Sequence, residues 1–281
     1  MVILTMFGTL YLVATPIGNL GDISVRAKQT LTDVDFIAAE DTRVTLKLLG
    51  HLGIKKQLVS YYEHNRRESG ERILARILDG ESCALVTDAG TPAISDPGED
   101  LVRLCADACV NMVTIPGPCA AIAALSLSGL IGGRFTFEGF LSTSRKSRFE
   151  HLEELKNEKR TMVFYEAPHK LLRTLNDMLE VFGDRRISIS RELTKIYEET
   201  LRFTLSEALE HFNERPPKGE FVLVIEGTAE TYEQEFGIDD AVLIATEYIE
   251  DGMSVKDAAK KVSEETGIAK NAIYSEIIHR A

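Results

Sequence analysis

Residues 82–98 read SCALVTDAGTPAISDPG and join an apolar run to a loop of small and turn-forming residues. The run Ser82–Thr87 is typical of a buried strand, because it is short, apolar and followed by turn formers. The loop after it offers glycine, alanine and proline, which let a ligand lie close to backbone amides and carbonyls. This stretch therefore predicts a strand whose carboxyl end opens into a binding site.

The same pattern extends to both sides of this stretch. Amphipathic segments such as Glu99–Ala108, with apolar residues at i, i+3, i+4 and i+7, separate further apolar runs. Strand–helix alternation of this kind predicts a parallel sheet with crossover helices. The other strands predicted in the first half are Leu10–Thr15, Phe36–Glu40, Gln57–Tyr62 and Asn111–Ile115.

The pattern changes after Phe135, where fewer helices separate the predicted strands. We expect a first α/β domain over residues 1–132, and a second, mixed α/β domain over residues 133–228. The strands predicted in the second domain are Thr136–Leu141, Thr161–Ala167, Ile187–Leu193, Thr200–Leu205 and Glu220–Glu226.

A third domain, over residues 237–281, is predicted to contain three short helices. Ser254 and Asp257 form an S-x-x-D helix start, and Gly267 breaks the pattern before a last helix, Lys270–Arg280. Two helices split by a glycine turn suggest a helix-turn-helix, although the spacing is longer than in the tight DNA-reading version. A nucleic-acid role and a plain packing role both stay open for this domain.

Composition limits the classes of function. The net charge of −12 argues against broad, nonspecific nucleic-acid binding but allows a local basic patch. No apolar run approaches the roughly 20 residues that cross a bilayer, so no membrane association is expected and the cytoplasm is the expected location. The four cysteines lack a second close ligand pair, so no metal site is expected.

Four loops at predicted strand ends form the candidate site. In open parallel sheets, ligands bind outside the carboxyl ends of the strands, where these loops would meet. Neither G-x-x-x-x-G-K-[ST] nor an early G-x-G-x-x-G is present, which removes support for a phosphate-cradling or dinucleotide fold. The loops are residues 15–22, 40–43, 87–98 and 115–120.

Seven ordered motifs resemble those of the tetrapyrrole-methylase superfamily, in particular those of its members that methylate ribosomal RNA. The resemblance runs from about Leu10 to Gly227, and the last segment is similar to a C-terminal helical domain of such members. The motifs are PIGNLGDI (16–23), EDTR (40–43), DAGTPAISDPG (88–98), IPGP (115–118), FYEAPH (164–169), RELTK (191–195) and KGE (218–220).

The resemblance implies a class III methyltransferase fold. It consists of two α/β domains with an S-adenosylmethionine cleft between them, plus a small helix-turn-helix-like C-terminal domain. The implied reaction is 2′-O-methylation of a cytidine ribose in the decoding region of 16S ribosomal RNA, within the small ribosomal subunit, by a homodimer. The implied cofactor-binding residues are Asp88, Ala89, Gly90, Cys119, Ala120, Tyr165, Glu192, Leu193, Gly219 and Glu220. Serine often stands in the family where Cys119 stands here, and a thiol is a weaker hydrogen-bond donor, so a backbone contact is the safer expectation at this position.

Catalytic and RNA-binding candidates follow from the same motifs and from local charge. The sequence selects no general base, because each catalytic candidate has an ordinary alternative role in an ion pair or a loop. The strongest RNA-binding candidate is the basic stretch Ser144–Arg148, expected as a loop, whose arginines suit phosphate. The catalytic candidates are Asn19, Asp41, Arg43, Glu192 and Lys195, and the RNA-binding candidates are Arg66, Arg67, Arg145, Lys146 and Arg148.

Two other functions remain as alternatives. A tetrapyrrole methyltransferase of corrin or sirohaem synthesis would keep the cofactor, but it would need a broad apolar trough rather than polar loops. A ligand-sensing DNA-binding regulator would need a basic recognition helix, and Lys270–Arg280 carries Glu276 and little excess positive charge.

Overall fold

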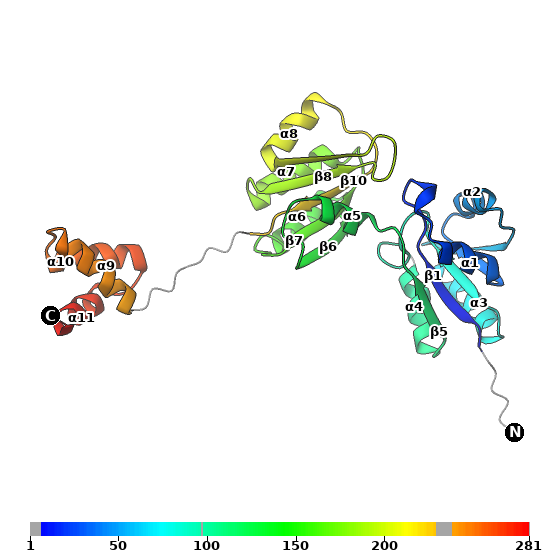
Figure 1. Cartoon of the computed structure of the whole chain (residues 1–281), viewed down its shortest axis with the longest axis horizontal. Coiled ribbons are helices and arrows are strands. Elements are labelled where there is room, and N and C mark those ends of the chain that lie inside the picture. The colour runs from blue at the N-terminus through cyan, green and yellow to red at the C-terminus, as the bar shows by residue number, and fades with distance from the viewer. Residues whose placement is uncertain (1–6, 97, 229–237, 281) are drawn as a thin grey trace, which may run out of the picture. The chain divides into compact units, whose positions relative to one another are not determined.

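The computed structural model describes residues 7–96, 98–228 and 238–280, and the edges of the expected domains at 1–6, 237 and 281 lie outside them. The described residues up to Thr228 form one compact unit, and Ile238–Arg280 belong to a second. The first unit contains two five-stranded sheets (Figure 1).

The first sheet is parallel throughout, with the strand order β3-β2-β4-β1-β5, as the strand–helix alternation predicted. Strands β2 and β4 are buried along their whole length, which explains why both are continuous apolar runs. The strands are β1 (Thr9–Val13), β2 (Phe36–Ala39), β3 (Gln57–Ser60), β4 (Cys83–Val86) and β5 (Asn111–Ile115).

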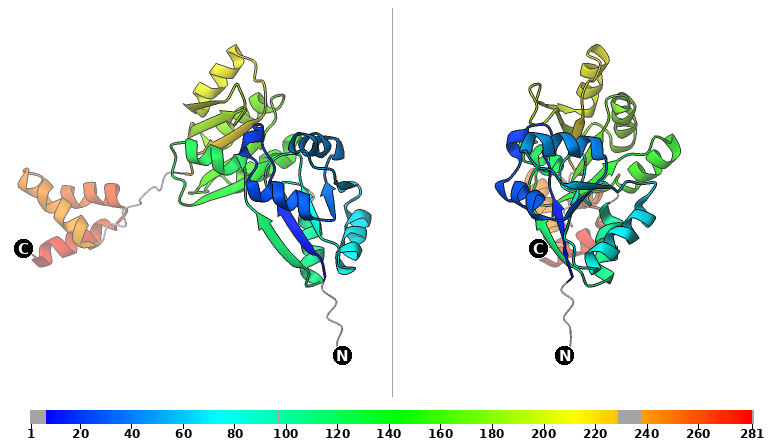
Figure 2. Two further views of the ribbon diagram at one scale, coloured as in Figure 1. Left: turned by 45° about the vertical axis from the view of Figure 1, so that its right-hand side comes forward. Right: turned by 90° about the vertical axis from the view of Figure 1, so that its right-hand side faces the viewer.

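Helices cover both faces of this sheet (Figure 2). On one face, α1 (Val25–Asp33) and α2 (Thr42–Leu52) bury Leu31 and Leu49 against the strands. On the other face, α3 (Arg66–Leu78) and α4 (Gly98–Asp107) form a separate core. Because both faces are covered, a ligand reaches the sheet only at its edge, where the loops leave the carboxyl ends.

The second sheet is mixed, with the order β6-β7-β10-β8-β9. Strands β6 and β7 run parallel, whereas β10 is antiparallel to β7 and β8, and β9 is antiparallel to β8. This arrangement confirms the predicted mixed α/β character. The strands are β6 (Phe135–Phe140), β7 (Thr161–Glu166), β8 (Arg186–Arg191), β9 (Glu199–Thr204) and β10 (Phe221–Ile225).

One core on this sheet is built by α6 (Arg145–Glu154), α7 (Leu171–Phe182) and α8 (Leu205–Glu214). Helix α6 begins at Arg145, so the stretch expected as a basic loop is the first turn of a helix. Ser144 occupies the N-cap position, although its side chain makes no capping hydrogen bond there.

Helix α5 (Ala120–Leu127) follows the last strand of the first sheet but packs on the second sheet. Its residues Ala121, Ala124 and Leu125 share a core with Val163 of β7 and Val222 of β10. The expected boundary at residue 132 assigned this helix to the first domain. Its packing instead makes it a structural link between the two sheets.

The second unit consists of α9 (Ile238–Glu250), α10 (Val255–Thr266) and α11 (Lys270–Arg280), which share one core. Ser254 caps α10 by accepting from the amide of Asp257, and Gly267 ends it in the left-handed region at φ +73°. Within the described ranges, no helix has the length and apolar character to span a membrane.

Candidate functional site

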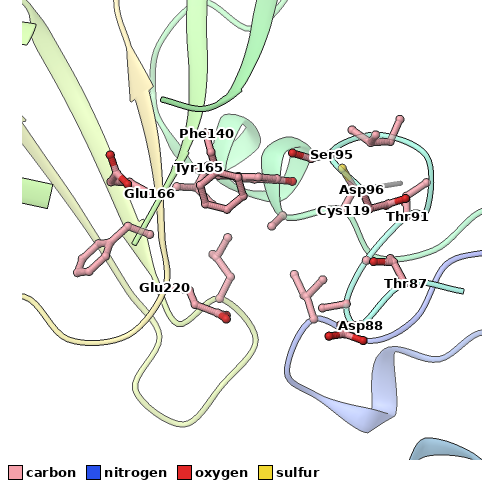
Figure 3. A pocket seen from close by; sticks show the side chains of 18 of the residues that line it. Thr87, Asp88, Thr91, Ser95, Asp96, Cys119, Phe140, Tyr165, Glu166 and Glu220 are labelled. Atoms are coloured by element: carbon pink, nitrogen blue, oxygen red, sulfur yellow. The ribbon is translucent and has the colours of Figure 1, made fainter. Parts of the chain in front are cut away.

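A pocket of about 520 Å³ lies at the carboxyl edge of the first sheet, and residues of both sheets line it (Figure 3). The first sheet contributes the loops after β1, β2, β4 and β5. The second contributes the ends of β6 and β7, the β8–β9 loop and the start of β10. The volume lies in the range of small-molecule sites, roughly 300–1,000 Å³.

The conformation of the loop after β4 is fixed by backbone hydrogen bonds and by the carboxylate of Asp96. Gly90, at φ +87°, exchanges two backbone hydrogen bonds of 2.9 and 3.1 Å with Thr15 of the β1 loop. Asp96 accepts from the amides of Ala93 and Gly98, each at 2.9 Å. Burial raises the pKa of Asp96. These contacts fix the loop that the opening sequence motif predicted as a binding loop.

Two carboxylates stand where β2 and β4 end. Glu40 accepts a 2.7 Å hydrogen bond from the hydroxyl of Thr87, and Asp88 accepts from the amide of Asp41 at 3.1 Å. Burial, together with the nearby Glu40, raises the pKa of Asp88. Charge is uneven around the described lining, which carries one ammonium group, Lys195, and five carboxylates, those of Glu40, Asp88, Asp96, Glu166 and Glu220, of which Glu166 is paired with Lys170 behind the lining. The pocket therefore favours a ligand with positive charge over a polyphosphate.

The opposite wall is aromatic. Tyr165 packs against Phe137 and Phe140, with ring centroids 5.0 and 5.4 Å apart. Its hydroxyl accepts from the amide of Ala121, at the start of α5, at 3.2 Å. Burial raises the pKa of Tyr165 to about 12, so the hydroxyl stays protonated near neutral pH.

Glu166 follows Tyr165 and is buried in the same wall. Its carboxylate pairs with the ammonium of Lys170 at 2.9 Å and accepts from the hydroxyl of Thr174 at 2.5 Å. With both partners in place, Glu166 supports the end of β7 rather than offering a free carboxylate to a ligand.

The β8–β9 loop carries Glu192 and Lys195, and both are hydrogen-bonded to Glu220, which precedes β10. These three residues form a polar triad. The Lys195 ammonium donates to Glu192 and to Glu220, each at 3.0 Å, and the amide of Glu220 donates to Glu192 at 3.1 Å. Partial burial acts to raise the pKa of Glu192, but these hydrogen bonds outweigh it and lower that pKa. In Lys195 burial acts in the opposite direction, and the two carboxylates still raise its pKa. Glu192 and Lys195 therefore both stay charged near neutral pH.

Gly219 provides space for this triad, and we expect Gly219→Ala to lower both stability and activity. Its φ is +87°, and an added Cβ would meet Glu192 at 2.6 Å. The left-handed conformation alone costs an L-residue about 1–2 kcal/mol. Gly53→Ala is the matched control, because Gly53 has φ +72° and open space around it. Urea unfolding and methyl-transfer rates of both variants test this, and equal activities would show that the triad tolerates displacement.

The structure gathers most of the implied cofactor-binding residues in one place. Gly219 and Glu192 lie outside the lining but are bonded to or packed against it, as described above. The implied residues that line the pocket are Asp88, Ala89, Gly90, Cys119, Ala120, Tyr165, Leu193 and Glu220.

Among the catalytic candidates, Lys195 lines the pocket, whereas three others have local structural roles. Asn19 caps the short 3-10 helix η1 (Leu20–Asp22) by accepting from the amide of Gly21. Asp41 caps α2 and pairs with Arg43 at 2.6 Å, and the hydrogen bonds from Arg43 lower the pKa of Asp41 to about 2. Arg43 itself is 86% exposed. These are the alternative roles that the sequence left open for these residues.

Several lining residues were not singled out as site residues. Glu40, Thr87 and Asp96 stand within or directly beside the quoted motifs, so the motifs carried a signal for them. Phe140, Phe221 and Val222 line the second-sheet wall from strand positions, where an apolar residue looks the same whether it faces a core or a pocket.

The RNA-binding candidates divide into exposed and buried side chains. Arg67, Arg145 and Lys146 are exposed and form loose ion pairs of 3.6–3.9 Å, and the Arg145 guanidinium also lies over the ring of Phe149. Arg66 is half-exposed and pairs with Asp100 at 3.1 Å.

Arg148 requires a correction. Its side chain is 7% exposed, and the guanidinium donates to Asp177 at 2.6 Å and to the carbonyls of Ser142 and Thr143. It lies on the inward face of α6 together with Leu152, four residues later, and these two are the buried residues of the helix. Its expected contact with RNA does not fit this environment.

Comparison with known proteins identifies the family. Residues 9–209 match the family model of tetrapyrrole (corrin/porphyrin) methylases. A ribosomal RNA small subunit methyltransferase I from Halalkalibacterium halodurans is 49% identical, over 95% of this chain and 94% of its own. Proteins of the same name from Synechocystis sp. and Bacillus subtilis are 46% and 45% identical, each over 95% of this chain and over 96% and 93% of their own.

Solved structures share the fold at much lower identity. Diphthine synthase aligns with a TM-score of 0.59 at 14% identity, over 79% of this chain and 91% of its own. Uroporphyrin-III-C-methyltransferase from Thermus thermophilus aligns with a TM-score of 0.55 at 19% identity, over 78% of this chain and 94% of its own. Taken with the pocket and the sequence matches, these findings show that the chain belongs to the tetrapyrrole (corrin/porphyrin) methylase family and, within it, to the ribosomal RNA small subunit methyltransferase I group.

Proposed function

We propose that this enzyme transfers a methyl group from S-adenosylmethionine to the ribose 2′-oxygen of a cytidine in the decoding region of 16S ribosomal RNA. The observation that carries the proposal is the acidic pocket with an aromatic wall, whose loops contain the motifs that resemble those of the family. The relatives that match over nearly the whole chain are named as ribosomal RNA methyltransferases, which favours RNA over a tetrapyrrole as the acceptor.

The pocket fits this cofactor chemically. A sulfonium and an amino-acid ammonium both carry positive charge, which the carboxylates of Glu40, Asp88 and Asp96 would stabilise. Tyr165 and Phe140 offer flat apolar surface for a purine ring. We propose that the backbone around Gly90 and Cys119 approaches the cofactor closely, since Gly90 presents no side chain there. When bound, the cofactor supplies an activated methyl group for displacement.

The residues of this chain then act mainly by positioning. Holding the attacking hydroxyl about 3–3.5 Å from the methyl carbon, in line with the breaking bond, contributes roughly 7–11 kcal/mol in well-oriented cases. Lys195 and Glu192 are the polar groups best placed for the acceptor side, because both lie on the β8–β9 loop at the pocket. We propose that the Lys195 ammonium stabilises the negative charge that develops on the ribose oxygen.

RNA binding requires positive charge that this acidic chain supplies only locally. We propose that Arg66, Arg67, Arg145 and Lys146 contact phosphates, and that the enzyme acts as a homodimer on the small ribosomal subunit. Because an acidic chain attracts RNA phosphates only weakly, complementary shape must contribute to binding, which favours a structured particle as the substrate. Equal rates on deproteinised RNA and on assembled subunits would contradict that part of the proposal.

The test is methyl transfer from labelled S-adenosylmethionine to small subunits that lack the modification, followed by mapping of the labelled nucleotide. Label on a ribose 2′-oxygen of a decoding-region cytidine supports the proposal. Label on a base would contradict it. Cofactor binding without transfer to any RNA would leave the pocket assignment standing and would move the acceptor to a small molecule.

A further inference from the structure

The β8–β9 loop has an inner and an outer side. Leu193 and Lys195 line the pocket, whereas Ile196 and Tyr197 point outward and are 95% and 73% exposed. Two adjacent large apolar side chains in water, next along the chain to the pocket-lining Lys195, gain nothing for the fold. Such exposure is typical of a surface that meets a partner.

The backbone of this loop is held in a costly conformation. Glu192 and Thr194 are not glycines, yet their φ angles are +49° and +66°, in the left-handed region. The amide of Glu192 donates to the carbonyl of Glu220, and the amide of Thr194 donates to the carboxylate of Glu198. The ion pairs of Lys195 fix the centre of the loop. Ile196 and Tyr197 therefore project from a loop whose backbone is fixed by hydrogen bonds and ion pairs.

The loop also contacts the first sheet. An added Cβ on Gly18, in the loop after β1, would lie 2.5 Å from Lys195 and 3.1 Å from the Thr194 hydroxyl. The loop thus closes one side of the pocket, and Tyr197 stands two residues beyond a pocket-lining ammonium. A group stacked on Tyr197 would lie next to a ribose presented to the pocket.

We infer that Tyr197 is a stacking platform for an unpaired nucleobase beside the ribose that receives the methyl group. This inference rests on the proposed RNA substrate. We propose that the RNA unstacks at the target nucleotide when its ribose hydroxyl enters the pocket. An exposed aromatic ring replaces the lost stacking with a face that accepts any base. Tyr197 is therefore a substrate-positioning residue.

Kinetics of four variants test the inference. We expect Tyr197→Ala to raise the KM for small subunits roughly 5- to 150-fold, the range that base–aromatic stacking supports. The kcat value and the affinity for S-adenosylmethionine should stay close to wild type, because the ring binds RNA alone. Tyr197→Phe keeps the ring and should behave as wild type, whereas Tyr197→Leu keeps apolar bulk alone and should resemble Tyr197→Ala. Phe7→Ala removes an exposed ring at the amino end of β1, opposite the pocket edge, and should have no effect.

Crosslinking decides the partner directly. A photoreactive phenylalanine at position 197 should crosslink to the nucleotide next to the mapped methylation site, and the same group at position 7 should not. A crosslink to ribosomal protein, or none to RNA, would overturn the inference. So would wild-type kinetics for Tyr197→Ala, or an activity loss that follows dissociation of a dimer in light scattering. If wild type methylates a base instead, the proposed reaction fails while the crosslink still decides whether Tyr197 meets RNA.

Discussion

Replacing Arg148 by alanine is expected to lower the free energy of unfolding by about 3–5 kcal/mol, because it leaves the buried carboxylate of Asp177 without its partner. The loss extends beyond one ion pair. The same guanidinium satisfies the carbonyls of Ser142 and Thr143, which hold the turn before α6. Urea unfolding followed by circular dichroism measures the effect.

A paired substitution separates the buried charge from the packing. In Arg148→Met with Asp177→Leu, both charges are absent and most of the volume remains, so the part of the loss due to the unpaired Asp177 charge should return, whereas the part due to the Ser142 and Thr143 carbonyls should not. Arg145→Ala is the matched surface control, with an expected change within about 0.5 kcal/mol. An Arg148→Ala protein that unfolds like wild type but binds RNA weakly would instead restore the direct RNA contact predicted from the sequence.

Replacing Lys195 by methionine is expected to reduce kcat by about 10²–10³, the usual cost of removing one group that stabilises developing charge in an active site. Methionine keeps most of the apolar stem while it removes the ammonium group. Without that group, the carboxylates of Glu192 and Glu220 face the acceptor side with no cation between them. Single-turnover methylation with saturating small subunits measures this step.

The division between KM and kcat identifies the role of Lys195. The unfolding midpoint should change little, because the Lys195 side chain is partly exposed. Cofactor affinity, measured by calorimetry, should also change little, because the proposed role of the ammonium is at the acceptor oxygen. A variant with normal kcat and a raised KM for RNA would make Lys195 a phosphate contact. Arg66→Ala offers the comparison, since Arg66 is proposed to bind RNA and lies outside the pocket lining.

The sequence predicted those features that depend on local pattern. The apolar run Ser82–Thr87 became β4, and its loop became a wall of the pocket, because a buried strand and its turn formers are both readable from neighbours in the chain. Features set by distant contacts were not readable. Arg148 resembles a surface arginine in sequence, and only Asp177, 29 residues away, turns it into a core residue. Phe140 and Phe221 became pocket residues only because two sheets meet there.

The position of α5 limits how this protein can be rearranged by recombination. The chain crosses from one sheet to the other immediately after the pocket-lining loop that ends at Cys119, and the helix that follows completes the core beneath β7 and β10. A breakpoint at residue 132 would carry this helix away with the first sheet and leave the second with an open apolar face. An exchange that keeps both cores whole must cut before α5, so the pocket-lining loop itself would be the junction between the two parents. Lineages of this fold should therefore inherit the two sheets together, with novelty confined to their loops.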